Sequence, residues 1–225
     1  CILIDKSEYK VMVVGSTGGG VFSHVARHKF VRDQILEVVA DRDCGLLSKA
    51  CGLGLPQCKL SASDGQEFSE NLLKRYGGDE TVIILSFYTK LFSEFLVNAL
   101  GGRIFNCHPS FKGLNAFDDT MASSALFMGC TIHQVDAFLD SGPSLIQAAY
   151  PIDRRLSLAA NRHKVFLMQY YTTLQFFKWL SEGRLVFDDY GVAKIKSACF
   201  KPSVFSPNLD EDLFVSASIH NELEC

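Results

Sequence analysis

Short apolar runs that alternate with helix-like segments constrain the fold of this chain most strongly. The first run, YKVMVVG at residues 9–15, is rich in valine and ends in glycine, as strands buried on both faces do. The glycine-rich stretch STGGG follows, and the next residues, VFSHVARHKF, have a helical pattern. A strand, a glycine-rich loop and a helix form the opening unit of a doubly wound α/β domain.

Further runs of the same kind predict the rest of a sheet. Strands are expected at residues 35–42, 81–87, 103–109, 130–136 and 144–152, and helices are expected at 45–55, from Ser63 or Asp64, at 93–101, 120–129 and 159–183. Glu67 would complete a capping box for the helix that starts near Ser63 or Asp64. The predicted fold class is therefore α/β, with a Rossmann-like, mostly parallel, twisted sheet flanked by helices.

The length of 225 residues suits one large domain or a domain with a tail. We expect an α/β domain at residues 1–185 and a C-terminal appendage at residues 186–225, packed on the domain or trailing from it. The appendage has two short strand-like pieces, at 184–189 and 193–200, before a polar end. No internal repeat, long linker or low-complexity stretch suggests a further division.

Charge and apolar content limit the partners that this chain is expected to have. The net charge of −3 argues against broad binding to nucleic acid or to a membrane surface. No apolar run approaches the roughly 18 residues that cross a bilayer, and charges at Asp5 and Lys6 interrupt the N-terminal run. We expect small-molecule substrates, no nucleic acid and no membrane partner, and the oligomeric state stays open.

Eight cysteines are scattered along the chain without a CxxC pair. Cys44, Cys51 and Cys58 are evenly spaced, but they lack the close ligand pairs and the nearby histidine of a zinc site. Reduced structural thiols are favoured over a metal site or disulfides. A cytoplasmic setting is therefore expected.

Three polar residues stand where the predicted strands end. Asn106 and His108 lie two residues apart at the end of the run RIFNCHP, and Asp140 follows the run CTIHQVD in the turn LDSGP. Ligands of open α/β sheets bind outside the carboxyl ends of the strands. Each residue alone is more often an ordinary loop residue, but the three together predict a site.

An amide, an imidazole and a carboxylate suit the transfer of an acyl group to an amine. Attack on a carbonyl carbon creates an oxyanion, to which the Asn106 amide and a protonated His108 can both donate hydrogen bonds. The Asp140 carboxylate can orient the imidazole and accept a proton from the amine through water. Because the amine attacks directly, no nucleophilic side chain is needed, and Cys107 is interpreted as a packing residue on the opposite face of the strand.

These motifs resemble the formyltetrahydrofolate-dependent formyltransferase family. The stretches that carry the resemblance are GGRIFNCHPSFKGLNAF, GCTIHQVDAFLDSGPSLI and SEGRL, and the resemblance extends from about residue 9 to about residue 200. It implies that a formyl group passes from 10-formyltetrahydrofolate, the cosubstrate, to the amine of glycinamide ribonucleotide in purine synthesis. It implies no metal.

The resemblance also implies roles for individual residues, in three groups. The catalytic group is Asn106, His108 and Asp140. The substrate-binding group is Ser16, Thr17, Gly18, Gly19, Gly20 and Gln169. The folate-binding group is Thr89, Lys90, Leu91, Phe92, Val97 and Asp136.

Three departures from the family pattern leave the acceptor open. Val21 stands where the family has an asparagine in the glycine-rich loop, and the loop after Ser110 is shorter than in the family. Gln169 stands near the position of a glutamate that meets the ribose hydroxyls. The alternatives are a formyltransferase for another amine, a formyltetrahydrofolate hydrolase, and a relative that binds a folate or a phosphorylated ligand without turnover.

Overall fold

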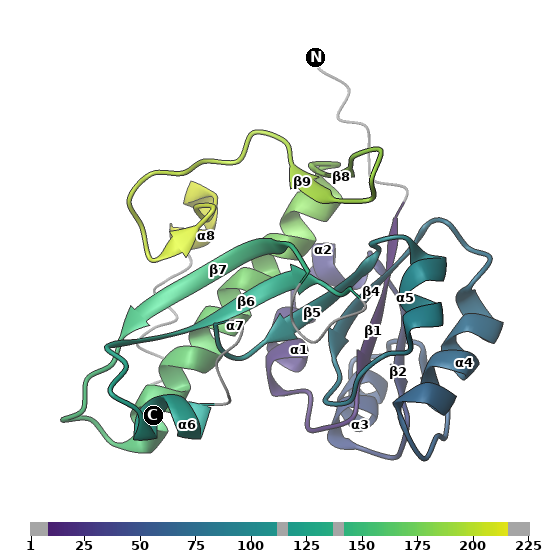
Figure 1. The fold of residues 1–225 in the computed structure, drawn as a ribbon, viewed down its shortest axis with the longest axis horizontal. Helices are drawn as coiled ribbons and strands as arrows, with labels where there is room; N and C mark the ends of the chain where they lie inside the picture. The colour runs from purple at the N-terminus through teal and green to yellow at the C-terminus, as the bar shows by residue number, and fades with distance from the viewer. Residues whose placement is uncertain (1–8, 112–116, 137–141, 216–225) are drawn as a thin grey trace.

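The computed structural model describes residues 9–111, 117–136 and 142–215, and its centre is one eight-stranded sheet (Figure 1). The strands follow the order β10-β7-β6-β5-β4-β1-β2-β3. Their bounds are β1 Lys10–Gly15, β2 Ile35–Ala40, β3 Gln57–Lys59, β4 Val82–Phe87, β5 Ile104–His108, β6 Phe127–Gln134, β7 Ser144–Pro151 and β10 Phe205–Ser206. A separate hairpin joins β8 Leu185–Phe187 to β9 Ala193–Ile195.

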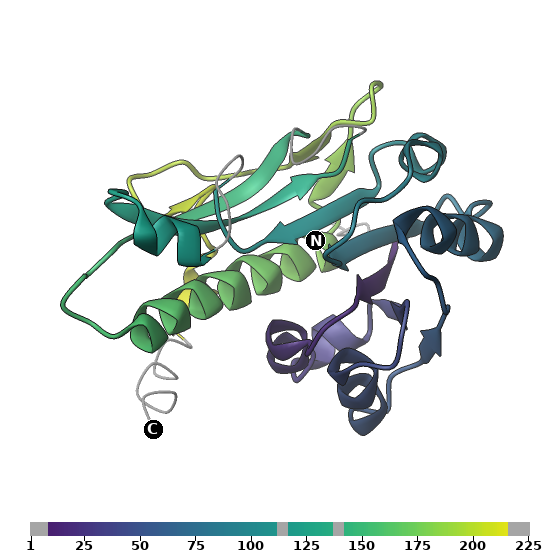
Figure 2. The ribbon, with the colours of Figure 1, turned by 60° about the horizontal axis from the view of Figure 1, so that its bottom comes forward.

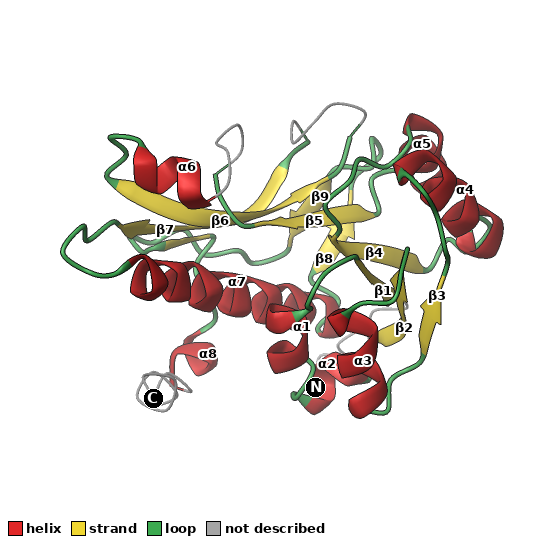
Figure 3. Cartoon of the chain, turned by 90° about the horizontal axis from the view of Figure 1, so that it is seen from below, coloured by secondary structure: helices red, strands yellow, loops and turns green. Residues whose placement is uncertain are grey.

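Helices cover both faces of the parallel part of the sheet (Figure 3). One face carries α1 Gly20–Val25, α2 Lys29–Arg32, α3 Gly45–Gly52 and the long α7 Leu158–Ser181, and the other carries α4 Gly65–Tyr76 and α5 Glu94–Leu100. The remaining helices are α6 Phe117–Ala122 and α8 Glu211–Val215. In the part of the chain that the structure describes, no helix is long and apolar enough to cross a membrane.

Burial on two faces explains why the first strand is a continuous apolar run. Val11 and Val13 point into the core beneath α1, α3 and α7, whereas Met12 and Val14 point into the core beneath α4 and α5. All four side chains are inaccessible to solvent. Successive residues of a strand face opposite sides, so a strand between two helical layers needs apolar residues throughout.

The sheet has a parallel part and an antiparallel part. Strands β3, β2, β1, β4 and β5 pair in parallel, and β6, β7 and β10 continue the sheet in antiparallel pairs. Helix α7 runs along the antiparallel extension and reaches the parallel part (Figure 2). The predicted fold class, a mostly parallel sheet flanked by helices, is confirmed.

Two predicted helix starts are confirmed by their caps. The Asp64 carboxylate accepts a hydrogen bond of 2.9 Å from the Glu67 amide, and the Glu67 carboxylate accepts one of 2.8 Å from the Ser63 amide. Ser93 caps α5 by accepting from the Leu96 amide, and Gly101 ends that helix with a positive φ of 53°. The capping box and the left-handed glycine are the features by which the sequence predicted where these helices start and end.

The prediction of a helix at residues 120–129 is wrong in its second half. Helix α6 ends at Ala122, and the chain is already in strand β6 at Phe127. Gly129 belongs to that strand and pairs with Ala149 of β7. The position needs glycine, because a Cβ there would lie 2.1 Å from the Ala148 carbonyl oxygen. Strand pairing therefore overrides the local helical pattern.

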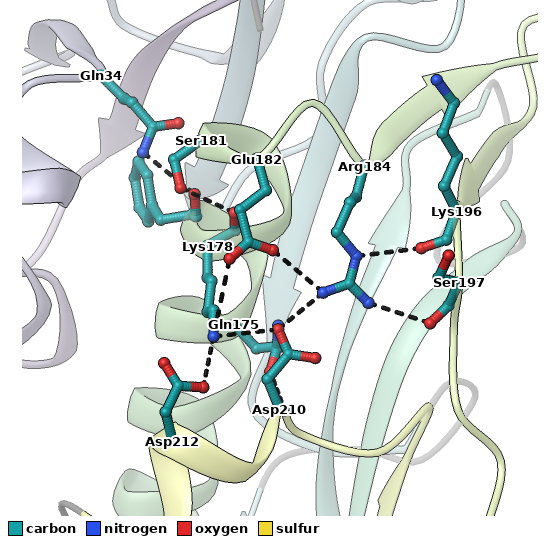
Figure 4. Close-up of polar contacts among 11 residues, drawn as sticks. Gln34, Gln175, Lys178, Ser181, Glu182, Arg184, Lys196, Ser197, Asp210 and Asp212 are labelled. Carbon is teal, nitrogen blue, oxygen red and sulfur yellow. Dashed lines mark hydrogen bonds and ion pairs between the residues drawn. The ribbon is translucent and has the colours of Figure 1, made fainter. Parts of the chain in front are cut away.

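Ion pairs join the end of α7 to the C-terminal part of the chain (Figure 4). The Arg184 guanidinium bonds the Asp210 carboxylate at 2.8 Å and the Glu182 carboxylate at 3.1 Å, and it also donates to the carbonyls of Lys196 and Ser197. Lys178 pairs with Asp210 and Asp212, and buried Gln175 holds the backbone amide of Asp210 at 2.7 Å. Leu209 and Leu213 bury their side chains in the main core.

Replacing Arg184 by Met is expected to lower the free energy of unfolding by about 1.5–3 kcal/mol. The guanidinium side chain is only 20% exposed, and its loss leaves Asp210 and two carbonyls with fewer donors. Urea unfolding measures the change. The control is Arg155→Met, which removes an ion pair of a 90% exposed side chain and should lower the free energy of unfolding far less, because solvent screens the pair. Equal losses in the two variants would contradict the role of the network.

Candidate active site

A cavity of about 570 Å³ opens at the carboxyl ends of the parallel strands. Its walls come from the loops after β1 and β4, from the end of β5 and from α7. The order of the strands reverses between β1 and β4, because the chain continues from β1 towards β2 and β3 and returns to β4 and β5 on the other side. A cavity at such a reversal point is where α/β sheets bind ligands.

Asn106 and His108 lie in the same wall of this cavity. They are two residues apart on β5, so both side chains leave the same face of the strand. Both are half-buried, whereas Cys107 between them is only 4% exposed and packs into the core. The end of β5 therefore presents an amide and an imidazole together to one cavity.

The imidazole of His108 is held by a neighbouring hydroxyl. Its Nε2 lies 2.7 Å from Oγ of Ser110, and that hydroxyl also donates to the Phe111 carbonyl at 3.1 Å. A hydroxyl has one proton, so when it bonds Phe111 it accepts from Nε2 of His108. The His133 ring lies edge-on at 6.2 Å between centroids. This arrangement orients the imidazole that faces the cavity.

The glycine-rich loop after β1 forms a second wall, with Thr17, Gly19 and Gly20 lining the cavity. Gly19 has a φ of +62°, and a Cβ there would lie 2.9 Å from the Leu46 Cα, so the position requires glycine. The Thr17 carbonyl accepts from the Leu46 amide at 3.0 Å, which fixes the loop on α3.

Two other residues of this loop lie outside the cavity lining. Ser16 is buried and bonds Thr89 at 3.1 Å, and Gly18 packs 3.0 Å from the position of a Cβ on Gly45. Val21 of α1 and Gln169 of α7 also line this side of the cavity.

The segment after β4 supplies a third wall. Thr89, Lys90 and Leu91 line the cavity. Phe92 and Val97, from the same predicted folate-binding group, instead pack in the core beneath α4 and α5, where the Phe92 ring stacks on Tyr88 at 5.5 Å. Three residues of the predicted folate-binding group therefore line the cavity, whereas Phe92 and Val97 lie in the core.

The two aspartates of the predicted site cannot be grouped with the cavity residues. Asp136 is half-buried after β6 and is not among the residues that line the cavity. Asp140 lies outside the described residues. Gly142, just beyond it, packs so closely that a Cβ would lie 2.0 Å from the Gln134 carbonyl oxygen.

Some cavity residues gave no signal in the sequence analysis. They are Phe22, Phe87, Tyr88 and Pro109, all of which line the cavity. Their apolar and aromatic types are the same as those of core residues, so only their places beside the strand ends could have identified them.

The thiols of the described residues are free, and among these residues no cluster of histidine, cysteine and acidic side chains could hold a metal ion. Burial raises the pKa of the Cys107 thiol to about 11 and raises that of Cys130 further. A thiol with so high a pKa is almost fully protonated near neutral pH. Cys107 is therefore a poor nucleophile, although it touches the cavity.

Thiol titration with an aromatic disulfide at pH 8 is expected to modify Cys51 and Cys199, which are exposed, long before Cys107 and Cys130. The reason is that burial shields the Cys107 and Cys130 sulfurs from the reagent and raises the pKa of both thiols, whereas the other two sulfurs are exposed. Peptide mapping of the modified protein identifies the sites, and unfolding in urea should make the buried pair reactive. Early modification of folded Cys107 would contradict its packing role.

Comparison with known proteins adds sequence evidence to this geometry. Residues 47–167, more than half of the chain, match the family described as formyl transferase. The chain is 31% identical over 93 residues to phosphoribosylglycinamide formyltransferase of Bacillus subtilis, covering 40% of this chain and 48% of that protein. It is 33% identical over 133 residues to the chloroplastic phosphoribosylglycinamide formyltransferase of Arabidopsis thaliana, covering 52% of this chain and 45% of that protein. The matches thus span about half the length of both relatives.

Solved structures share the fold over most of the chain. Glycinamide ribonucleotide transformylase 1 from Symbiobacterium toebii superposes with a TM-score of 0.70 at 24% identity, covering 84% of this chain and 95% of that one. A formyltetrahydrofolate deformylase from Pseudomonas syringae superposes with a TM-score of 0.66 at 18% identity, covering 83% and 66%. At these identities the likeness establishes the fold alone.

Proposed function

Because the chain belongs to the formyl transferase family, we propose that it transfers a formyl group from 10-formyltetrahydrofolate to the amine of glycinamide ribonucleotide. The observation that carries the proposal is the cavity at the ends of β1, β4 and β5, which has Asn106 and His108 in one wall. The relatives named phosphoribosylglycinamide formyltransferase support this acceptor. Purine synthesis is the corresponding process.

In the proposed reaction the amine attacks the formyl carbon directly. The carbonyl oxygen becomes negatively charged, and the Asn106 amide and the protonated imidazole of His108 donate hydrogen bonds to it. Asp140 accepts the amine's proton through water. As the oxyanion collapses to a carbonyl, the carbon–nitrogen bond to the donor breaks, and the departing tetrahydrofolate nitrogen takes up that proton. The cavity residues Asn106 and His108 are the described part of this machinery.

The two substrates would occupy different walls of the cavity. We assign the phosphate of the acceptor to the backbone amides of Ser16–Gly20, since a glycine-rich loop can bring amides close to an anion, and its ribose to Gln169. In the described residues, no hydrogen bond from the amides of Thr17, Gly18 and Gly19 to the protein competes with this role.

The folate would lie against the segment after β4. Thr89, Lys90 and Leu91 line the cavity there, and Leu91 is 64% exposed, so its apolar surface is available to a flat heterocycle. Phe92 and Val97 would support this wall from behind, and Asp136 would contribute from the end of β6. No metal enters the proposed reaction.

A hydrolase is the second candidate, because a formyltetrahydrofolate deformylase shares the fold. The same oxyanion donors would stabilise the oxyanion that forms when water attacks.

A reducing compartment such as the cytoplasm is also part of the proposal and is supported by the free thiols of the described cysteines. One relative is chloroplastic, so relatives of this chain can occupy different compartments.

Isothermal titration calorimetry tests the assignment of the acceptor. Glycinamide ribonucleotide should bind with a stoichiometry of one, and inorganic phosphate should compete with it if the glycine-rich loop holds the phosphate. Gln169→Leu should weaken binding of the ribonucleotide but leave competition by phosphate unchanged. An absence of binding, with folate binding retained, would favour the hydrolase.

A further inference from the structure

A buried carboxylate lies beside the cavity and takes no part in the chemistry proposed above. Asp41 follows β2 at the carboxyl edge of the sheet, and its side chain is inaccessible to solvent. Arg42 holds it with two hydrogen bonds, from Nε at 3.0 Å and from Nη2 at 2.7 Å. A charge this deeply buried is retained only when its partners offset the cost of removing it from water.

Two further partners of Asp41 come from the segment that lines the cavity. Lys90 Nζ lies 3.1 Å from Oδ2 of Asp41, and the Tyr88 hydroxyl lies 3.4 Å from the same oxygen. Lys90 also donates to the Ser63 carbonyl at 3.1 Å. One carboxylate therefore links the end of β2 to both residues that flank Thr89 in the cavity wall.

The charged surroundings of Asp41 favour its ionised form. Burial alone would raise the pKa of the carboxyl, but the hydrogen bonds and positive charges of Arg42 and Lys90 outweigh burial, so the pKa lies below its ordinary value. The other charged groups on that side are Asp43, Lys59 and Glu67, which line the neighbouring surface. Asp43 pairs with Lys59 at 2.6 Å, and the Glu67 carboxylate caps α4, so each has a partner of its own.

The rest of the segment is held by weaker or more local contacts. The Thr89 hydroxyl bonds Ser16 at 3.1 Å, and Gly65 of α4 packs against the Leu91 carbonyl, where a Cβ would lie 2.0 Å away. Neither contact carries a charge. The ion pair with Asp41 is thus the strongest polar restraint on the wall in the described residues.

We propose that Asp41 is a positioning residue for formyl transfer, which fixes Tyr88 and Lys90 and so holds residues 88–91 in the shape that binds the formyl donor. This inference rests on the proposed function for the identity of the ligand. Asp41 acts through the wall and touches no reacting atom. Because the wall binds donor and transition state alike, loosening it raises KM for the donor and leaves kcat nearly unchanged.

The main variant is Asp41→Asn, which keeps the shape of the side chain and removes its charge. Asp43→Asn is the matched control, because it makes the same change two residues away at a side chain that is 85% exposed. Amide hydrogen exchange of the ligand-free protein reports the position of residues 88–93 without any substrate. Steady-state kinetics with varied formyl donor report KM and kcat.

Asp41→Asn is expected to speed amide exchange in residues 88–93 and to raise KM for the donor about tenfold. A tenfold rise corresponds to a wall that adopts its binding conformation in about a tenth of the molecules. The kcat should stay within about twofold of the unmodified protein. Asp43→Asn should change neither quantity. Lys90→Met removes the same ion pair from the other side, and it should speed exchange in the same residues even if Asp41→Asn does not fold.

Unchanged exchange in residues 88–93 in both variants would overturn the proposal. So would a fall in kcat at unchanged KM in Asp41→Asn, because that result would place the carboxylate in the chemistry. Unmodified protein that shows no turnover would contradict the proposed function instead, and the exchange measurement would still decide whether Asp41 holds the wall.

Discussion

Replacing Asp140 by Asn is expected to reduce kcat for formyl transfer by about 10³-fold or more. The amide keeps the shape of the carboxylate, but it has no charge to orient a protonated imidazole and cannot take up the proton that the attacking amine loses. Asp140 lies outside the described residues, so the expectation rests on the motif LDSGP and on the family. Steady-state kinetics at saturating substrates measure the loss.

The control for this variant is Asp189→Asn, which makes the same change at an exposed position between β8 and β9. It should leave kcat and KM unchanged. Circular dichroism and calorimetric binding of the folate should show that Asp140→Asn still folds and binds. Near-normal turnover by a folded Asp140→Asn variant would mean that another group accepts the proton.

Asn106→Ala and His108→Ala are each expected to lower kcat by about 10²–10³-fold while folate binding persists. Both side chains line the cavity from one face of β5, so each can supply a donor to the same developing oxyanion. Asn98→Ala, at an exposed position on α5, is the matched control and should be fully active.

A variant that carries both Asn106→Ala and His108→Ala tests whether the two residues act on the same oxyanion. If Asn106 and His108 act on one oxyanion, removing both should cost less than the product of the two single losses. Strictly multiplicative losses would point to two independent tasks. Unchanged kcat in both single variants would place the chemistry elsewhere and reduce the likeness to one of fold.

The parallel part of the sheet was predictable because its strands are buried on both faces. In β1 every residue after Lys10 is apolar or glycine and is buried, and the glycine at its end marks the turn to the cavity. The same strand prediction placed Asn106 and His108 at the carboxyl end of a strand, where ligands of open α/β sheets bind, and both residues line the cavity.

What the sequence could not predict depends on contacts between distant segments. Strands β3 and β10 have three residues and two residues, too few for a periodic pattern. Gly129 was predicted to end a helix, because the sequence alone does not show that the backbone of β7 packs closely against it. The ion pair of Asp41 with Lys90 joins residues 49 positions apart, and neither residue carries a local signal of the other.

The measurement that tests the central claim most directly is a turnover assay with 10-formyltetrahydrofolate labelled in its formyl carbon. With glycinamide ribonucleotide present, the label should appear on the amine of the ribonucleotide, and consumption of the donor should require this acceptor. Release of the label as formate at the same rate without any acceptor would contradict formyl transfer and identify a hydrolase.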